Sequence, residues 1–89
     1  MSIEKFVEKV CDKLGKDPYP YDVTLRAFLI IRENEELYKE YQTFCLPDIN
    51  GTIGRLIKEH YGFDDAGGAI NVSDYLLIKS FTPHKKKEI

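Results

Sequence analysis

The chain has 89 residues, enough for one hydrophobic core, so we expect a single domain over residues 1–89. A hydrophobic content of 43% excludes disorder over the whole chain, and the longest strongly apolar run, residues 27–31, is far shorter than the ~20 residues of a membrane span. The formal net charge of -2 argues against a domain that coats nucleic acid without sequence preference. Residues 50–89 hold six basic and five acidic side chains, against seven and ten in the first 49 residues, so an anionic partner would favour the C-terminal half.

The first predicted element is a helix from Ser2 to about Leu14. Its apolar residues recur at spacings of three and four, and charged residues cover the opposite face. Ser2 can cap the start of this helix and Gly15 can end it. Residues 17–22 contain two prolines and form a linker, and Asp22 at its end can cap the next helix.

Residues 23–44 form a second helical stretch. Residues 25–31 are apolar nearly all round, so a strand competes with a helix there; we expect a helix because its spacing continues from the cap. Asn34 interrupts the pattern, and the acidic pair that follows it suits a helix N-terminus. The stretch is therefore either one long helix or two helices with a corner near Asn34, and Pro47 ends it.

A short connection leads to another predicted helix, from about Thr52 to Tyr61. Asn50 or Thr52 can cap it, and Gly62 can end it. Ile53 and Ile57 belong to its apolar face, while basic and polar residues remain for the outside.

The C-terminal part has a different character. Residues 64–71 lack a helical period and contain two adjacent glycines, which predicts a flexible loop or a hairpin tip. Residues 75–82 are β-prone and predict a strand, after which residues 84–89 form a frayed tail.

The expected fold class is α+β, with three or four helices followed by a C-terminal β-hairpin or strand. One core should collect apolar residues from all segments: Phe6, Val10, Phe28, Leu29, Leu37, Tyr41, Ile53, Leu56, Ile57 and Leu77.

The residue types that often carry chemistry are sparse. Cys11 and Cys45 lie at apolar positions of helical patterns, so we expect both thiols to be buried, reduced and inert in a cytoplasmic protein. His60 and His84 lack a metal-binding spacing and are predicted to lie on the surface. No CxxC pair, phosphate-binding glycine loop or EF-hand spacing is present, so we expect no metal, no cofactor and no enzymatic activity.

The stretch from Leu37 to Phe63 has the layout of a helix-turn-helix. In such a unit the second helix enters the major groove of DNA with its N-terminal residues forward. Thr52 can bond a phosphate or a base edge, and Arg55 can bind guanine through two hydrogen bonds. Lys58 would then lie over the phosphate backbone.

Within this stretch, ELYKEYQTFC followed by NGTIGRLIKEHYGF, a glycine-containing loop and a strand resembles winged helix-turn-helix domains. The nearest analogues are the domains at the C-terminal end of phage and plasmid primase-helicases, and the resemblance covers residues 36–82. It implies a winged-helix-like fold with a recognition helix at about 52–61. By resemblance, Thr52, Arg55 and Lys58 take the recognition positions, and residues 67–71 with Lys79 form the wing.

Two functions follow from these observations. The first is a small DNA-binding module for double-stranded DNA, in which Lys79 and residues 85–87 hold phosphates beside Arg55 and Lys58. The alternative is a protein–protein interaction or dimerisation domain that uses an exposed strand edge or an apolar helix face, with a protein partner or a second copy of the chain. DNA binding requires Arg55, Lys58 and Lys79 on one continuous face, whereas an interaction domain requires an exposed apolar patch or an open edge.

Overall fold

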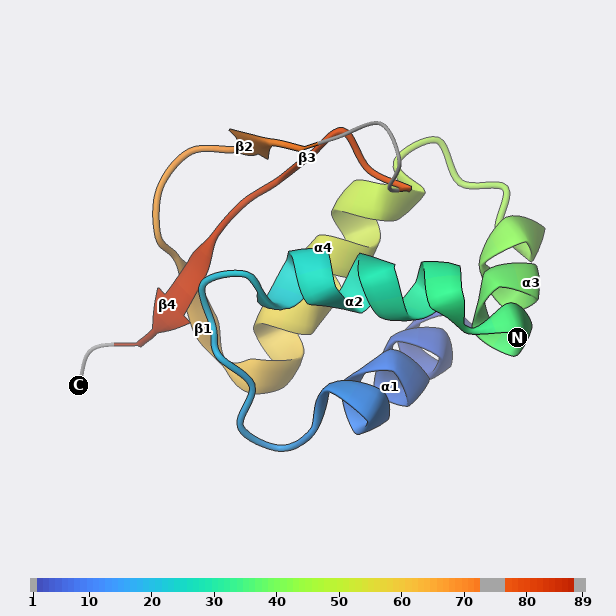
Figure 1. Ribbon diagram of the computed structural model, residues 1–89, viewed down its shortest axis with the longest axis horizontal. Coiled ribbons are helices and arrows are strands. Elements are labelled where there is room, and N and C mark those ends of the chain that lie inside the picture. The colour runs from blue at the N-terminus through green and yellow to red at the C-terminus, as the bar shows by residue number, and fades with distance from the viewer. Residues whose placement is uncertain (1, 73–76, 88–89) are drawn as a thin grey trace.

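The computed structural model describes residues 2–72 and 77–87 and has the expected α+β fold (Figure 1). Four helices come first along the chain, and short antiparallel strands follow. The helices are α1 (Ile3–Leu14), α2 (Val23–Glu33), α3 (Glu35–Thr43) and α4 (Ile49–Tyr61); the strands are β1 (Phe63–Asp65), β2 (Ile70–Asn71), β3 (Ser80–Phe81) and β4 (His84–Lys86).

Helix α1 begins and ends as its sequence predicts. The Ser2 hydroxyl accepts a hydrogen bond of 3.2 Å from the Lys5 backbone N–H, which satisfies one of the unpaired donors of the first turn. Gly15 ends the helix with φ of 94°, a backbone conformation that favours glycine. The hydroxyl of Tyr61 lies within hydrogen-bond distance of the carbonyls of Cys11 (3.1 Å) and Gly15 (2.7 Å), which connects the end of α4 to the end of α1.

The chain between residues 23 and 44 forms two helices with a corner at Asn34. The Asn34 side-chain oxygen accepts from the Leu37 backbone N–H at 3.0 Å and caps α3. Its own backbone N–H donates to the Ile30 carbonyl at 3.0 Å and completes the last turn of α2. Asp22 precedes α2 but does not cap it through its side chain, because its carboxylate binds the Arg26 guanidinium at 3.0 Å instead.

Helix α4 begins at Ile49, earlier than the predicted start at about Thr52. The Thr52 backbone N–H donates to the Asp48 carbonyl at 3.0 Å, so Thr52 lies inside the helix and not at its cap. Asn50 does not cap the helix either, since its side chain is bonded elsewhere. Gly62 ends the helix at φ of 68°, as the sequence indicates.

The strands belong to two stretches of chain, residues 63–72 and 77–86, which run antiparallel to each other and together form a ribbon. β1 pairs with β4, with Phe63 opposite Lys86, and β2 pairs with β3, with Ile70 opposite Phe81. Residues 66–69 on one side face only residues 82–83 on the other, so the ribbon bulges between its two ladders. In Figure 1 this ribbon runs from the C-terminal end of α4 back to the N-terminal end of the same helix.

Three predictions for this C-terminal part need correction. Residues 64–71 are not only loop, because they contribute to β1 and β2. The predicted strand 75–82 is limited to Ser80–Phe81 among the described residues, and its positions 75–76 lie outside them. The predicted tail is wrong for His84–Lys86, which form β4: pairing with the distant β1 gives this polar segment its partner.

The core lies between the helices and one side of the ribbon. Of the predicted core residues, Phe6, Val10, Phe28, Leu37, Ile53 and Ile57 are buried, and Tyr41, Leu56 and Leu77 pack partly buried against them. Leu29 is only half-buried. The ribbon adds three buried side chains that the sequence did not single out: Phe63, Ile78 and Phe81. Cys11 belongs to this core as predicted, but Cys45 is exposed because it lies beyond the last turn of α3; both are free thiols.

Candidate functional site

A groove of about 630 Å³ lies between α4 and the second stretch of the ribbon, residues 77–86. Helix α2 contributes the buried residues Thr24 and Phe28 to its wall. The remaining lining comes from α4 with the residue before it, from β1, and from the chain around β3 and β4. These residues are Asp48, Asn50, Gly51, Gly54, Arg55, Lys58, Asp65, Leu77, Ile78, Lys79, Ser80, Phe81, Thr82 and His84.

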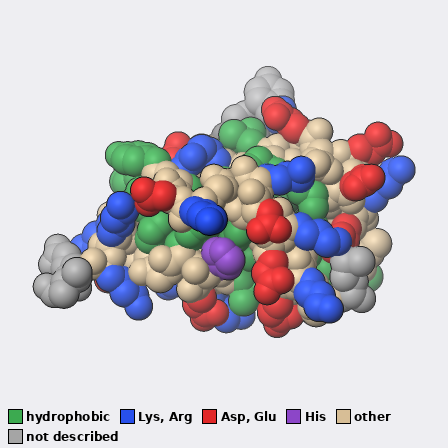
Figure 2. Space-filling model, turned by 90° about the horizontal axis from the view of Figure 1, so that it is seen from below, with side chains coloured by type: hydrophobic (Ala, Val, Ile, Leu, Met, Phe, Trp, Pro, Cys, Tyr) green, Lys and Arg blue, Asp and Glu red, His purple; other side chains and the backbone are tan. Residues whose placement is uncertain are grey.

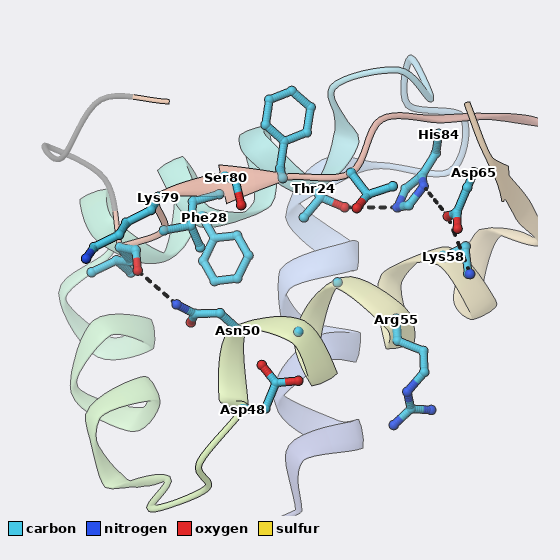
Figure 3. Close-up of a pocket in the computed structure, with 16 residues that line it drawn as sticks. Thr24, Phe28, Asp48, Asn50, Arg55, Lys58, Asp65, Lys79, Ser80 and His84 are labelled. Carbon is cyan, nitrogen blue, oxygen red and sulfur yellow. Dashed lines mark hydrogen bonds and ion pairs between the residues drawn. The ribbon is translucent and has the colours of Figure 1, made fainter. Parts of the chain in front are cut away.

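Three of the predicted DNA-binding residues line this groove. Arg55 and Lys58 come from α4, and Lys79 comes from the ribbon (Figure 3). Figure 3 places Lys79 near one end of the groove and Lys58 near the other. Thr52 is half-buried on α4 and does not belong to the groove lining.

The lysines of residues 85–87 lie outside the groove lining. All three are exposed, and the Lys86 ammonium lies 3.6 Å from the Asp17 carboxylate in the linker before α2. The predicted phosphate contacts of these lysines are therefore not part of the same cavity.

The guanidinium of Arg55 is held only loosely. It lies 3.3 Å from the Glu59 carboxylate one turn further along α4, and both side chains are 57% exposed. Such an exposed ion pair contributes about 0–1 kcal/mol, so a phosphate or a base edge could displace Glu59 at small cost.

The groove side of α4 has two glycines, and a neighbouring side chain lies against each of them. A Cβ atom on Gly54 would lie 3.6 Å from the Thr24 methyl group, which is an ordinary contact. A Cβ atom on Gly51 would lie 2.5 Å from an Asp48 carboxylate oxygen, so a larger residue there would have to push Asp48 aside. Glycine at position 51 thus lets the Asp48 carboxylate rest against the first turn of α4, where negative charge is favoured.

Asn50 fixes the ribbon to the start of α4. Its amide nitrogen donates to the Leu77 carbonyl at 2.9 Å, and its oxygen accepts from the Tyr41 hydroxyl at 2.6 Å. Burial raises the pKa of Tyr41 above its ordinary value, so the phenol stays protonated and able to donate. One side chain therefore joins α3, α4 and the ribbon, and sequence reasoning considered Asn50 only as a helix cap.

A row of four polar side chains, Thr24, His84, Asp65 and Lys58, lies at the end of the groove near β4. His84 is 4% exposed, although the sequence predicted a surface position. A hydrogen bond of 3.2 Å joins its Nε2 to the Thr24 hydroxyl, 60 residues away in the chain. Its Nδ1 lies 3.3 Å from Asp65 Oδ1, and the same oxygen lies 3.4 Å from the Lys58 ammonium (Figure 3).

The surroundings of His84 favour the neutral form of its imidazole. Burial lowers the pKa of His84 below its ordinary value, and the Lys58 charge lowers it further, while Asp65 opposes both effects. His84 Nδ1 has no well-aligned hydrogen bond among the described residues, even though Asp65 is near. Asp65 is thus an acidic neighbour that Lys58 and His84 share.

Thr24, His84 and Asp65 follow the hydroxyl–imidazole–carboxylate order of a hydrolase triad. The Thr24 residue, however, is only 5% exposed, in the first turn of α2, so its hydroxyl is poorly placed to meet a substrate carbonyl. The row instead connects α2, β4, β1 and α4.

The groove carries a small excess of positive charge. Its lining includes three basic side chains, Arg55, Lys58 and Lys79, and two carboxylates, Asp48 and Asp65. Over the face shown in Figure 2, basic and acidic side chains are interspersed and neither sign dominates. An anion bound here would be held by local contacts in the groove rather than by a field over that whole face.

Comparisons with protein-family models, with curated proteins and with solved structures found no match to this chain. Among the described residues, no three histidine, cysteine or acidic side chains gather in a way that could hold a metal ion. No helix in the part of the chain that the structure describes has both the length and the apolar character to cross a membrane.

Proposed function

We propose that this protein binds double-stranded DNA through the groove between α4 and the ribbon. The observation that carries the proposal is that Arg55, Lys58 and Lys79, from two separate elements, line one cavity. Backbone phosphates are recognised chiefly by lysine and arginine side chains, and contacts from two elements fix the orientation of the duplex.

The order of elements supports the same function. Helix α3, a short connection, α4 and an antiparallel ribbon follow one another as the helix-turn-helix and wing do in winged domains. In this arrangement Arg55 leaves Glu59 and reaches a base edge, and Lys58 and Lys79 neutralise phosphates.

The acidic side chains beside the basic residues lower the expected affinity for DNA. Lys58 has to leave Asp65 before it can bind a phosphate, and Asp48 repels any phosphate near the first turn of α4. We therefore expect binding that is measurable at low salt and weakens steeply as salt rises.

The proposal is tested by fluorescence anisotropy with a labelled random-sequence duplex at low salt. Arg55→Ala should weaken binding to a duplex selected from the random pool by about 1–3 kcal/mol, and Lys79→Ala should weaken binding to selected and random duplexes about equally. Lys39→Ala is the matched control, because Lys39 pairs with Glu35 at the same helical spacing on α3 but lies outside the groove lining. All three variants should keep a nearly unchanged melting temperature, as exposed residues usually do.

Absence of duplex binding by the wild-type protein, or an equal loss in Lys39→Ala, would overturn the proposal. The interaction-domain alternative would then take its place. Tyr19 and Tyr21 favour that alternative, since they are 68% and 45% exposed in the linker before α2. Sedimentation of the purified protein would test whether a second copy covers them.

A further inference from the structure

We propose that DNA binding by this protein takes up a proton on His84, because Asp65 exchanges Lys58 for His84 when Lys58 moves to a phosphate. This inference rests on the proposed DNA-binding function and adds a regulatory property to the same groove.

The exchange follows from one shared oxygen atom. Asp65 Oδ1 lies 3.4 Å from the Lys58 ammonium and 3.3 Å from His84 Nδ1. The Lys58 side chain is 33% exposed, so it can turn towards a phosphate in the groove, whereas the His84 side chain is 5% exposed and stays in place. When Lys58 moves away, the Asp65 carboxylate still has His84 beside it, and His84 can become a cation by taking up a proton.

The surroundings of His84 suit both protonation states. Its charged neighbours among the described residues are Asp65 from β1 and Lys58 from α4, while α2 brings only the uncharged Thr24 hydroxyl. The Tyr21 carbonyl accepts a hydrogen bond of 3.3 Å from the backbone N–H of His84, and this bond does not involve the ring. A protonated ring would donate from Nε2 to Thr24 and from Nδ1 to Asp65, so both nitrogens would have partners.

The charges near the His84 ring differ between the free protein and the DNA complex. In the free protein, burial and the Lys58 charge together hold the pKa of His84 below its ordinary value of about 6.5. In the complex the Lys58 charge is directed to a phosphate, Asp65 is left without a lysine, and the DNA adds negative charge nearby. Each change favours the imidazolium, so the pKa of His84 should rise on binding.

The sign of the pH dependence follows from this rise. Between the lower pKa of the free protein and the higher pKa of the complex, binding consumes a proton. Affinity for DNA should therefore increase as the pH falls, by at most about tenfold per pH unit for one proton. The phosphodiesters of DNA do not titrate in this range, so the dependence would report on the protein.

The test is duplex affinity measured by anisotropy between about pH 5.5 and 8 at constant ionic strength. We expect the wild-type protein to bind more tightly at the acidic end and His84→Gln to bind with an affinity that does not change with pH. His60→Gln is the matched control: His60 is exposed near the end of α4, outside the groove, and this variant should keep the wild-type pH dependence. Asp65→Asn should bind more tightly than wild type at pH near 8, because Lys58 is then released at every pH. It should also show a weaker pH dependence than wild type, because no carboxylate remains beside His84.

A measurement on the wild-type protein guards against a misfolded variant. The pKa of His84, followed by NMR of its imidazole C–H groups, should be higher with duplex than without. Binding with a pH-independent affinity, or an unchanged His84 pKa in the complex, would overturn this inference and leave the DNA-binding proposal intact. No binding at any pH would overturn both.

Discussion

Asn50 and His84 each connect separate parts of the chain through one side chain. Asn50 is hydrogen-bonded to the Tyr41 hydroxyl and the Leu77 carbonyl. His84 is hydrogen-bonded to Thr24, and its other ring nitrogen lies 3.3 Å from Asp65. These two residues stand at opposite ends of the groove in Figure 3. The shape of the groove therefore depends on a few polar side chains as well as on the core behind it.

The two cysteines provide a direct check of burial at the residue scale. Burial raises the pKa of the Cys11 thiol to about 11, so it forms little thiolate and should not react in the native protein. Cys45 is exposed and should react at once with a thiol reagent, which corrects the sequence-based expectation that both are inert. We expect one fast thiol in native buffer, a second only on unfolding, and no fast thiol in Cys45→Ser. Equal rates for both thiols would show that α1 does not pack as described.

The residues that line the groove were only partly predictable. Arg55 and Lys58 could be assigned from their outward positions on a helical pattern, since that needs only local spacing. His84 could not be found in this way, because its burial depends on Thr24, 60 residues earlier in the chain. A histidine beside three lysines has the local composition of a tail, and nothing in it signals a buried partner.

The helices and the ribbon differ in how much the sequence reveals. α1 was predicted closely, because its apolar face and its caps lie within the helix itself. The sequence allows either one helix or two across Asn34, and the structure has two, with the Asn34 side chain as the cap of α3. The strands contain only two or three residues each, too few for an alternating pattern, and β4 pairs with a segment on the far side of the ribbon.

The contact between the ribbon and α4 can be tested by removing its connecting side chain. Asn50→Ala leaves the Leu77 carbonyl and the Tyr41 hydroxyl without their partner, and we expect a loss of about 1–3 kcal/mol in the free energy of unfolding. The same variant should weaken DNA binding, because Lys79 is no longer held opposite α4. Asn71→Ala, at an exposed position of β2, is the control and should be near neutral in urea denaturation. If the two variants are equally stable, Asn50 does not carry this contact.

At the scale of the whole molecule, one core supports both the helices and the groove. Phe28 is 1% exposed within that core and also belongs to the groove wall, so the same side chain serves stability and the shape of the site. A domain of this length has little stability to spare. The fold class could be predicted from the sequence, whereas the groove could not, because it forms only when the ribbon returns to the start of α4.

Truncation of Phe28 tests this picture of the core. Phe28→Ala should cost about 3–5 kcal/mol in urea denaturation, since it removes a fully buried ring and leaves a cavity. Tyr19→Ala, at an exposed aromatic position, should change stability by less than about 0.5 kcal/mol. A loss at Phe28 as small as that at Tyr19 would mean that α2 is not packed in the core.

The salt dependence of duplex binding tests the central claim most directly. Each phosphate neutralised by a basic side chain contributes about -0.9 to the slope of log affinity against log salt, and we expect contacts from Lys58 and Lys79 to give a steep negative slope. Lys58→Ala should make that slope shallower by about one unit, while Lys39→Ala should leave it unchanged. A slope near zero, or a Lys58→Ala slope equal to that of the wild-type protein, would contradict the assignment of this groove as a DNA-binding surface.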